Sequence, residues 1–214
     1  MFLLQTPGGL SAVTDYTGFL GSTDFVPTVA TMNRAHSSHW TANPDVRIPH
    51  VLKGWSDDPR DPADHQLDLG EMIVRNVPTD IRSAWGEGAE RNGNSIFVFE
   101  VEGLCIGHLG HLHHEPDEGQ YAALGRLDVV MAPVDGGLTL DLPSMIRVLN
   151  RLRSSVVIPM HWFGGGSLET FLAGMSDEFD IVRPGENSVE ISLRTLPSRP
   201  TVHVLEPAWM RPAD

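Results

Sequence analysis

Short apolar runs separated by glycine and proline make up most of the chain, a pattern typical of strands joined by turns. Residues 2–5 and 10–16 flank the turn sequence PGG at 7–9, which predicts a hairpin. Residues 25–32 and 95–101 are rich in β-branched and aromatic side chains. Such side chains pack well on a half-buried sheet, so both segments are predicted to be strands.

The second half of the chain alternates between strand and helix patterns. Apolar residues recur at helical spacing in 142–152, and the continuous apolar run 156–160 predicts a strand. The glycine- and charge-rich segment 82–93 predicts a loop, and 189–193 predicts a further strand. Other expected elements are a short apolar element at 51–55, strands within 67–77 and at 104–109, 127–134, 179–182 and 202–205, and helices at 115–124 and 168–175. This order predicts an α/β sandwich in which helices cover sheets.

The composition indicates a folded soluble protein. Hydrophobic residues make up 41% of the 214 positions and charged residues 20%, so we expect a buried core and a single domain over residues 1–214. The formal net charge of −13 disfavours nucleic acid and anionic membranes as partners. The expected partner is a small-molecule substrate, and the acidic surface favours a neutral one. The single cysteine, Cys105, cannot form an internal disulfide, and we expect a cytoplasmic location. Homo-oligomerisation is left open.

Histidines gather behind three of the expected strands. Seven of the ten lie there: His36, His39, His108, His111, His113, His114 and His161. A single histidine taken alone is more often a surface residue or a hydrogen-bonded core residue than a metal ligand. Imidazole is, however, the commonest protein ligand for zinc-like metals, and strand ends are rigid places to hold one. The repetition at three strand ends predicts a metal site.

Three stretches place these histidines in motifs: VATMNRAHSSHW, GLCIGHLGHLHH and VVIPMHW. In order and spacing they resemble motifs of the metallo-β-lactamase superfamily, especially its lactonase-like and phospholipase D-like branch. The first resembles Thr-His-x-His-x-Asp-His, with His36 and His39 at two of its histidines. The second resembles His-x-Gly-Asp, with His111 at the aspartate that bridges two metals. The third is similar to the segment that supplies the last metal ligand, here His161.

The resemblance extends over about residues 2–193 and implies the superfamily's fold, a four-layer αββα sandwich of the α/β class. The family usually has a strand or two before the first hairpin of this chain, so we expect the first strand or strands to be missing. Asp15 in SAVTDYTG would be a buried carboxylate behind the metal ligands. His108 would assist the ligands at 36, 39, 111 and 161.

Three positions depart from the family pattern. Arg34 stands where the first histidine of the first motif belongs, Ser38 where its aspartate belongs, and Asp80 where a further metal histidine belongs. A guanidinium cannot ligate a metal, and serine is a poor ligand. We therefore expect one divalent metal instead of two, with zinc as the first expectation and manganese or iron as alternatives.

These residues predict a metal-dependent hydrolase. Three protein ligands plus water leave the open position that catalysis needs, and an ester, lactone or phosphodiester is the expected substrate. His114 is the candidate proton donor and Arg34 a candidate clamp for a developing anion. Asp80 is a candidate catalytic carboxylate that could also assist the ligands. Arg34 and Ser38 keep a second hypothesis open, a metal-free binding or scaffold protein. Nucleic-acid processing is the weakest hypothesis because the chain has no basic run.

Overall fold

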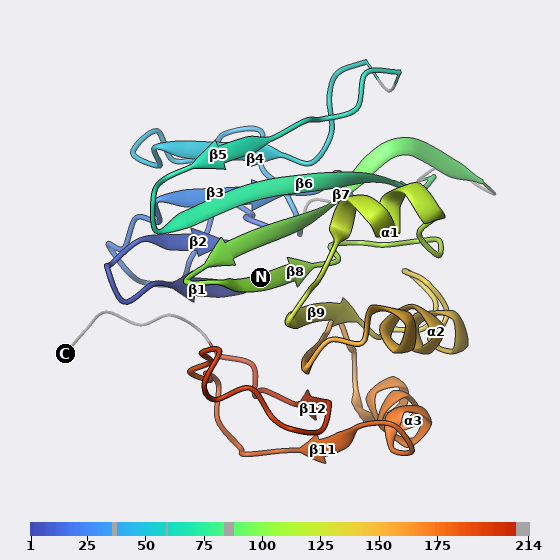
Figure 1. Cartoon of the computed structure of the whole chain (residues 1–214). Helices are drawn as coiled ribbons and strands as arrows, with labels where there is room; N and C mark the ends of the chain where they lie inside the picture. Colours follow the sequence, from blue (N-terminus) through green and yellow to red (C-terminus); the bar gives the residue numbers. More distant parts are fainter. Residues whose placement is uncertain (36–37, 59, 84–87, 209–214) are drawn as a thin grey trace.

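The computed structural model describes residues 1–35, 38–58, 60–83 and 88–208 (Figure 1). Its strands are β1 (Leu3–Gln5), β2 (Ser11–Val13), β3 (Val29–Met32), β4 (His50–Lys53), β5 (Gln66–Asp68), β6 (Met72–Arg82), β7 (Ala89–Val101), β8 (Leu104–His108), β9 (Val129–Pro133), β10 (Val156–Met160), β11 (Asp180–Val182) and β12 (Thr201–His203). Its helices are α1 (Glu118–Leu124), α2 (Leu142–Leu152) and α3 (Gly165–Met175).

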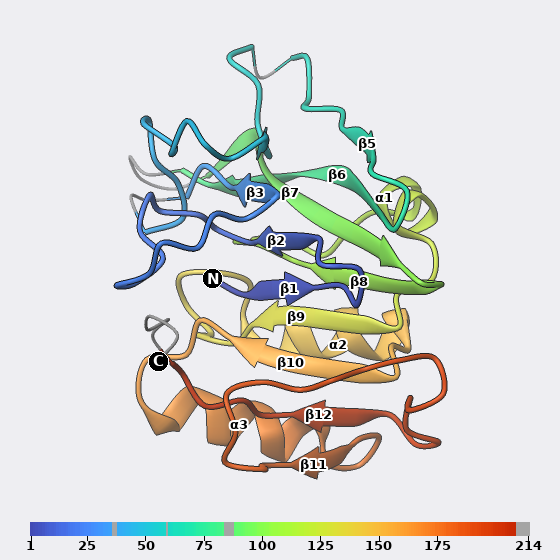
Figure 2. The ribbon, with the colours of Figure 1, turned by 90° about the vertical axis from the view of Figure 1, so that its left-hand side faces the viewer.

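The strands form two sheets that face each other (Figures 1 and 2). The smaller sheet has the order β1-β2-β3-β4, with β1 antiparallel to β2 and the other neighbours parallel. The larger sheet has the order β11-β12-β10-β9-β8-β7-β6-β5. Strands β5 to β8 are joined by antiparallel pairing, whereas β8, β9, β10, β12 and β11 pair in parallel.

Apolar side chains hold the layers together. Between the sheets, Ala12 and Val29 pack with Phe97 and Phe99, all fully buried. The other face of the larger sheet is covered by the helices, which bury residues such as Phe171 (Figure 1). Burial of large apolar side chains on both faces of one sheet explains why the central strands read as continuous apolar runs.

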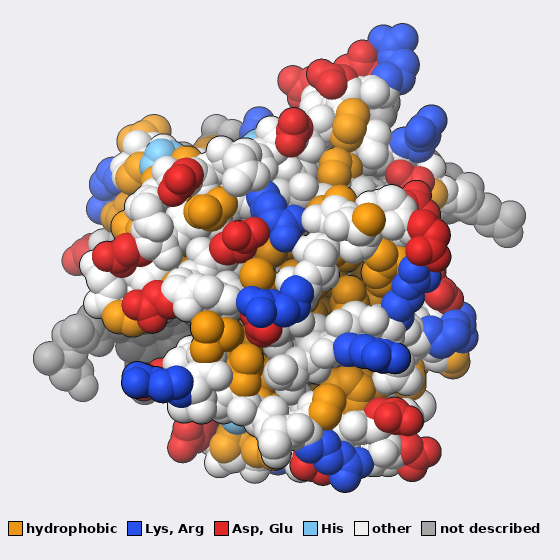
Figure 3. Space-filling model, in the orientation of Figure 1, with side chains coloured by type: hydrophobic (Ala, Val, Ile, Leu, Met, Phe, Trp, Pro, Cys, Tyr) orange, Lys and Arg blue, Asp and Glu red, His pale blue; other side chains and the backbone are white. Residues whose placement is uncertain are grey.

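Loops cover the outer face of the smaller sheet. Tyr16, Leu20 and Ile48 pack there against Met32. In the described part of the chain the helices thus lie on one side of the sandwich (Figure 1). The expected α/β fold with two facing sheets and covering helices is confirmed. In the described residues, loops instead of helices form the outer layer of the expected four-layer sandwich on the smaller sheet. None of the described helices is long and apolar enough to cross a bilayer. On the face drawn in Figure 3, acidic and basic side chains are interspersed.

Two sequence-based expectations about local structure are wrong. The segment 82–93 is not a loop throughout, because β6 and β7 extend into it as a long hairpin. Asn92 adopts φ +54° and the pairing register shifts between Thr79 and Ile81, so the turn-forming residues mark a bulge. Residues 189–193 form no strand. Val189 and Ile191 instead pack against the β9–β10 face, which accounts for their alternation.

The carboxyl ends of the parallel strands meet at one edge of the sandwich. In Figure 2 the arrowheads of β2, β3, β9 and β10 point to the same side. Strand β8 runs parallel to β9 and ends at the same edge. Loops that leave such an edge are held by rigid strands, and ligands of α/β proteins bind there.

Candidate metal centre

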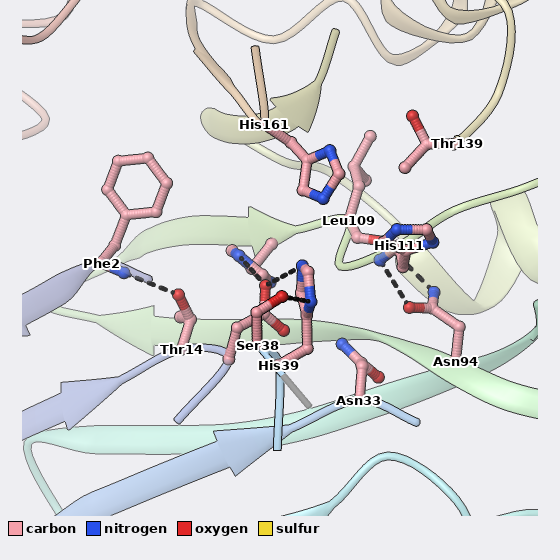
Figure 4. Close-up of polar contacts among 12 residues, drawn as sticks. Phe2, Thr14, Asn33, Ser38, His39, Asn94, Leu109, His111, Thr139 and His161 are labelled. Carbon is pink, nitrogen blue, oxygen red and sulfur yellow. Dashed lines mark hydrogen bonds and ion pairs between the residues drawn. The ribbon is translucent and has the colours of Figure 1, made fainter. Parts of the chain in front are cut away.

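Three histidines from separate loops meet at this edge. The ring centroids of His39, His111 and His161 lie 5.0–5.2 Å apart, so the rings form a nearly equilateral triangle. Each residue offers a ring nitrogen within 4.8 Å of the other two. Figure 4 shows the three rings converging. His39 and His111 are buried, and only 10% of the His161 side chain is exposed.

The strands place each imidazole. His39 lies in the loop after β3, His111 follows the end of β8 by three residues, and His161 comes directly after β10. The backbone of His161 has φ +56°, in the left-handed region that residues other than glycine rarely adopt. Surrounding structure must hold this conformation, which costs about 1 kcal/mol or more. Such backbone strain is typical of functional sites.

Asp135 orients His161. Its Oδ2 accepts a hydrogen bond from Nδ1 of His161 at 2.9 Å and another from the Thr139 hydroxyl at 2.6 Å, while Oδ1 accepts the backbone N–H of Gly137 at 2.9 Å. Burial raises the pKa of the Asp135 carboxyl, but these hydrogen bonds outweigh burial and hold the pKa well below its ordinary value. The ionised carboxylate keeps the His161 proton on Nδ1 and leaves the Nε2 lone pair for a metal.

Two buried asparagines fix the loops of the other histidines. Asn33 Oδ1 accepts the backbone N–H of Ser95 at 2.7 Å, which ties the loop after β3 to β7. Asn94 Oδ1 accepts the backbone N–H of His111 at 2.7 Å. Gly110 lies between the two amides with φ +60°, where a Cβ atom would stand 2.3 Å from Asn33 Nδ2 and 2.5 Å from Asn94 Oδ1. Only glycine fits this contact.

A buried carboxylate lies behind the triangle, as the resemblance implied. Asp15 Oδ2 stands 3.9 Å from His39 Nε2 and 3.5 Å from His108 Nε2. The side chain of His108 has no exposed surface, and burial lowers its pKa to about 4. A neutral His108 therefore packs beside Asp15. The structure does not group His108 with the triangle as a ligand.

The candidate catalytic residues Asp80 and His114 lie against each other. The backbone N–H of Asp80 donates to His114 Nε2 at 3.0 Å, and His114 Nδ1 donates to the Glu115 carbonyl at 2.9 Å. The Asp80 carboxylate accepts the backbone N–H of Asn92 at 3.0 Å. Both ring nitrogens of His114 are thus engaged, so proton donation by this residue would require one of these bonds to break. The structure does not bring either residue into the triangle.

The remaining predicted residues are spread over the first loop. Arg34 forms an ion pair with Glu90 at 2.9 Å, with 48% of its side chain exposed. The Ser38 hydroxyl lies 3.0 Å from His39 Nδ1 and contacts a candidate ligand (Figure 4). His36 lies outside the described residues, so its predicted role as a ligand stays a prediction.

The donor set suits a metal ion. Ring nitrogens of three imidazoles lie within 4.8 Å of one another, and the other ring nitrogen of His161 is hydrogen-bonded to the carboxylate of Asp135. Neutral nitrogen ligands of this kind bind zinc, iron and similar divalent ions, and a carboxylate behind a ligating histidine is the usual way to fix its tautomer. Three protein ligands also leave a position open.

Sequence reasoning missed two residues that position this site. Asp135 follows β9 in the sequence PVDGG, and a carboxylate between a strand end and a glycine pair could have been recognised. Asn94 lies within β7 and gives no motif signal, because its role depends on a contact with a loop 17 residues away.

Comparisons with known proteins agree with the geometry. The profile described as "Beta-lactamase superfamily domain" matches residues 1–161. A "UPF0173 metal-dependent hydrolase" of Carboxydothermus hydrogenoformans is 28% identical over 99 residues, which is 45% of this chain and 44% of the relative. Another, from Pyrococcus furiosus, is 27% identical over 130 residues, 56% of each. The chain thus spans about half the length of these relatives.

Solved structures share the fold. A protein from Thermotoga maritima, described as a Zn-dependent hydrolase of the metallo-beta-lactamase superfamily, has a TM-score of 0.63 and 23% identity. The similarity covers 95% of this chain and 93% of that one. A metal-dependent hydrolase from Parabacteroides distasonis has a TM-score of 0.57 and 12% identity, covering 82% and 93%. At these identities the likeness shows a common fold.

Proposed function

This chain belongs to the beta-lactamase superfamily, and from that premise we propose that it is a metal-dependent hydrolase with a mononuclear site formed by His39, His111 and His161. The triangle of buried imidazoles is the observation that carries the proposal. The names of the relatives from Carboxydothermus and Pyrococcus support the class of activity. The proposed substrates are small esters, lactones or phosphodiesters.

The chain's own residues prepare the site. Asp135 holds a proton of His161 on Nδ1, so that Nε2 is the ring nitrogen available to a metal. Asn94 and Asn33 hold the two loops so that the imidazoles converge before any ligand binds. A divalent metal bound there supplies a Lewis acid and makes a water molecule more acidic.

A single metal accounts for the departures from the family pattern. Arg34 stands where the first histidine of the first motif belongs and is paired with Glu90, so it offers no ligand atom. Ser38 contacts His39 and supplies a hydroxyl in place of a carboxylate. His39 stands at a histidine of the first motif, His111 at the bridging aspartate and His161 at the last metal ligand. We therefore propose that the metal bound by these three positions persists and that the other metal of the family pair is lost.

Metal analysis tests this function. Protein purified without added metal should hold about one equivalent of a divalent ion per chain, and His111→Ala and His161→Ala should hold about a tenth or less. His50→Ala is the matched control, because His50 lies at the opposite, amino end of β4. Two equivalents in the wild type would overturn the mononuclear site. A tenth of an equivalent or less, with no thermal shift on adding zinc, manganese or iron, would favour the metal-free alternative.

A further inference from the structure

A hollow of about 350 Å³ opens beside the metal centre, and the proposed chemistry leaves it unexplained. It is lined by Arg34, Trp40, Thr41, Lys53, Trp55 and Asp57, among others. These residues lie at the carboxyl ends of β3 and β4, which run parallel to each other. Trp40 directly follows His39 in the chain. The hollow therefore lies on the same strand-end edge as the three histidines, next to the loop that carries one of them.

Aromatic surface dominates one part of the hollow. The rings of Trp40 and Trp55 pack edge to face with centroids 5.8 Å apart. Both are only partly buried against the outer core of the smaller sheet, so part of each indole remains open to the hollow. A partly open tryptophan pair offers a planar ligand a large apolar contact at little cost in side-chain entropy.

Among the described residues that line the hollow, the positive charge that belongs to no ion pair is that of Lys53, which is the only lysine in the chain. Its Nζ lies 5.9 Å from the centre of the Trp55 ring. Among the residues that the structure describes, no carboxylate forms an ion pair with this ammonium group. Arg34, by contrast, is paired with Glu90 at 2.9 Å. Lys53 is exposed, so its ammonium group is available to a ligand.

We propose that this hollow binds an aromatic carboxylate, with the ring against Trp40 and Trp55 and the negative charge on Lys53. A cationic ligand would meet the Lys53 ammonium over the Trp55 ring and be repelled. Asp57 also lines the hollow, so the carboxylate must lie on the Lys53 side. Binding of the aromatic carboxylate does not depend on the proposed function. The role of the hollow as the subsite that recognises the uncleaved part of the substrate does rest on that function.

The single lysine makes binding directly observable. Reductive methylation with ¹³C-formaldehyde labels Lys53 and the N-terminal amine, giving two NMR signals. Titration with benzoate should shift the Lys53 signal and leave the N-terminal signal in place. Benzyl alcohol and benzyltrimethylammonium, which carry the same ring with no charge or a positive charge, should bind at least about tenfold more weakly. Benzoate that leaves the Lys53 signal unmoved, or tighter binding of the cation, overturns the proposal.

Variants locate the site by calorimetry. Lys53→Met and Trp55→Leu should each weaken benzoate binding by about tenfold. Arg126→Met removes one positive charge at the amino end of β9, where 65% of the Arg126 side chain is exposed, and should leave binding unchanged. If Lys53→Met binds benzoate as the wild type does, or if Arg126→Met weakens it equally, the assignment of the charge to Lys53 is wrong.

Hydrolysis separates this inference from the proposed function. Metal-loaded wild type should cleave 4-acetoxybenzoate with a higher kcat/KM than phenyl acetate, and Lys53→Met should lower that ratio by about tenfold. Arg126→Met should keep the wild-type ratio. Cleavage of neither ester would count against the hydrolase, while the benzoate titration still decides the subsite. Cleavage of both with an unchanged ratio in Lys53→Met would overturn the subsite as a recognition element and leave the hydrolase intact.

Discussion

Asp135 Oδ2 accepts a hydrogen bond from His161 Nδ1 at 2.9 Å and so determines which ring nitrogen of His161 faces the other two histidines. The same carboxylate accepts the Thr139 hydroxyl and backbone N–H groups of its own loop. Every acceptor direction of Asp135 is therefore satisfied by a donor. An amide in its place would have to turn an N–H group toward one of these donors.

Replacing Asp135 by asparagine should weaken metal binding by about 10- to 100-fold. If the new amide N–H faces His161, the imidazole must accept at Nδ1 and carry its proton on Nε2, where a metal should bind. Competition with a chromophoric chelator measures the affinity. Asp141→Asn is the matched control, because Asp141 caps α2 through the Ser144 backbone N–H and asparagine caps equally well. Equal metal affinity in wild type and Asp135→Asn would contradict the orienting role.

Gly110→Ala should lower the free energy of unfolding by more than backbone strain alone would. A Cβ atom there would meet Asn33 Nδ2 at 2.3 Å and Asn94 Oδ1 at 2.5 Å, so the variant must move the loop that carries His111. We expect a loss of about 3 kcal/mol in the free energy of unfolding together with reduced metal content. Urea unfolding and metal analysis measure the two effects.

Gly185 provides the control for this substitution. Its φ is +73°, and nothing lies within 4 Å of the position of its Cβ atom. Gly185→Ala should therefore show only the cost of an alanine at positive φ, about 1 kcal/mol, with normal metal content. Similar losses in the two variants would mean that the contact with the two asparagines does not matter.

Asn94→Asp should destabilise the protein although the two side chains have almost the same size and shape. Asn94 is fully buried, and its Nδ2 donates to Thr79 Oγ1 at 2.8 Å and to the Leu109 carbonyl at 3.2 Å. A carboxylate would set an oxygen against that carbonyl and bury a charge, at a cost of about 3 kcal/mol. Thermal and urea unfolding measure the loss. Asn150→Asp on the exposed side of α2 should stay within about 0.5 kcal/mol of the wild type.

The order of helices and strands could be predicted because apolar residues recur at helical or strand spacing in this chain. Residues 142–152 and 156–160 form α2 and β10 with the predicted bounds, since their burial follows directly from spacing. The extension of β6 and β7 into the segment 82–93 was not predictable from composition. Glycine and charge occur both in loops and in exposed strands with a bulge, and only the pairing partner distinguishes them. Residues 189–193 resembled a strand for a different reason, because Val189 and Ile191 alternate with polar residues while packing on the β9–β10 face without strand pairing.

The metal-binding histidines of the candidate site could be predicted from the sequence, but the residues that orient them could not. His39, His111 and His161 each follow a strand end, and parallel strands bring such ends together. The partners that orient them depend on tertiary contacts, which spacing does not encode. Asp135 is an example, because its role depends on a neighbouring strand that returns 26 residues later. His114 illustrates the converse, since its place in a motif did not reveal its bonds to Asp80 and Glu115.

His108 makes the stability of the fold depend on pH. Burial lowers its folded-state pKa to about 4, whereas an unfolded histidine has a pKa of about 6.5. Between these values the unfolded chain binds a proton that the folded chain does not. Stability therefore falls as the pH is lowered from about 6.5 to about 4 and levels off below that range. The neighbouring Asp15 carboxylate opposes this effect in part, because it favours the charged imidazole.

Replacing His108 by glutamine, which does not titrate, should remove this dependence. Between pH 7 and pH 4.5 the wild type should lose about 2 kcal/mol more than His108→Gln in the free energy of unfolding. Urea unfolding in the presence of a chelator measures this, since release of metal from the other histidines would otherwise add its own pH dependence. The comparison uses the slope with pH, so a general loss of stability in the variant does not obscure it. Parallel curves for the two proteins would show that folding does not shift the pKa of His108, which would contradict the neutral imidazole in the folded state.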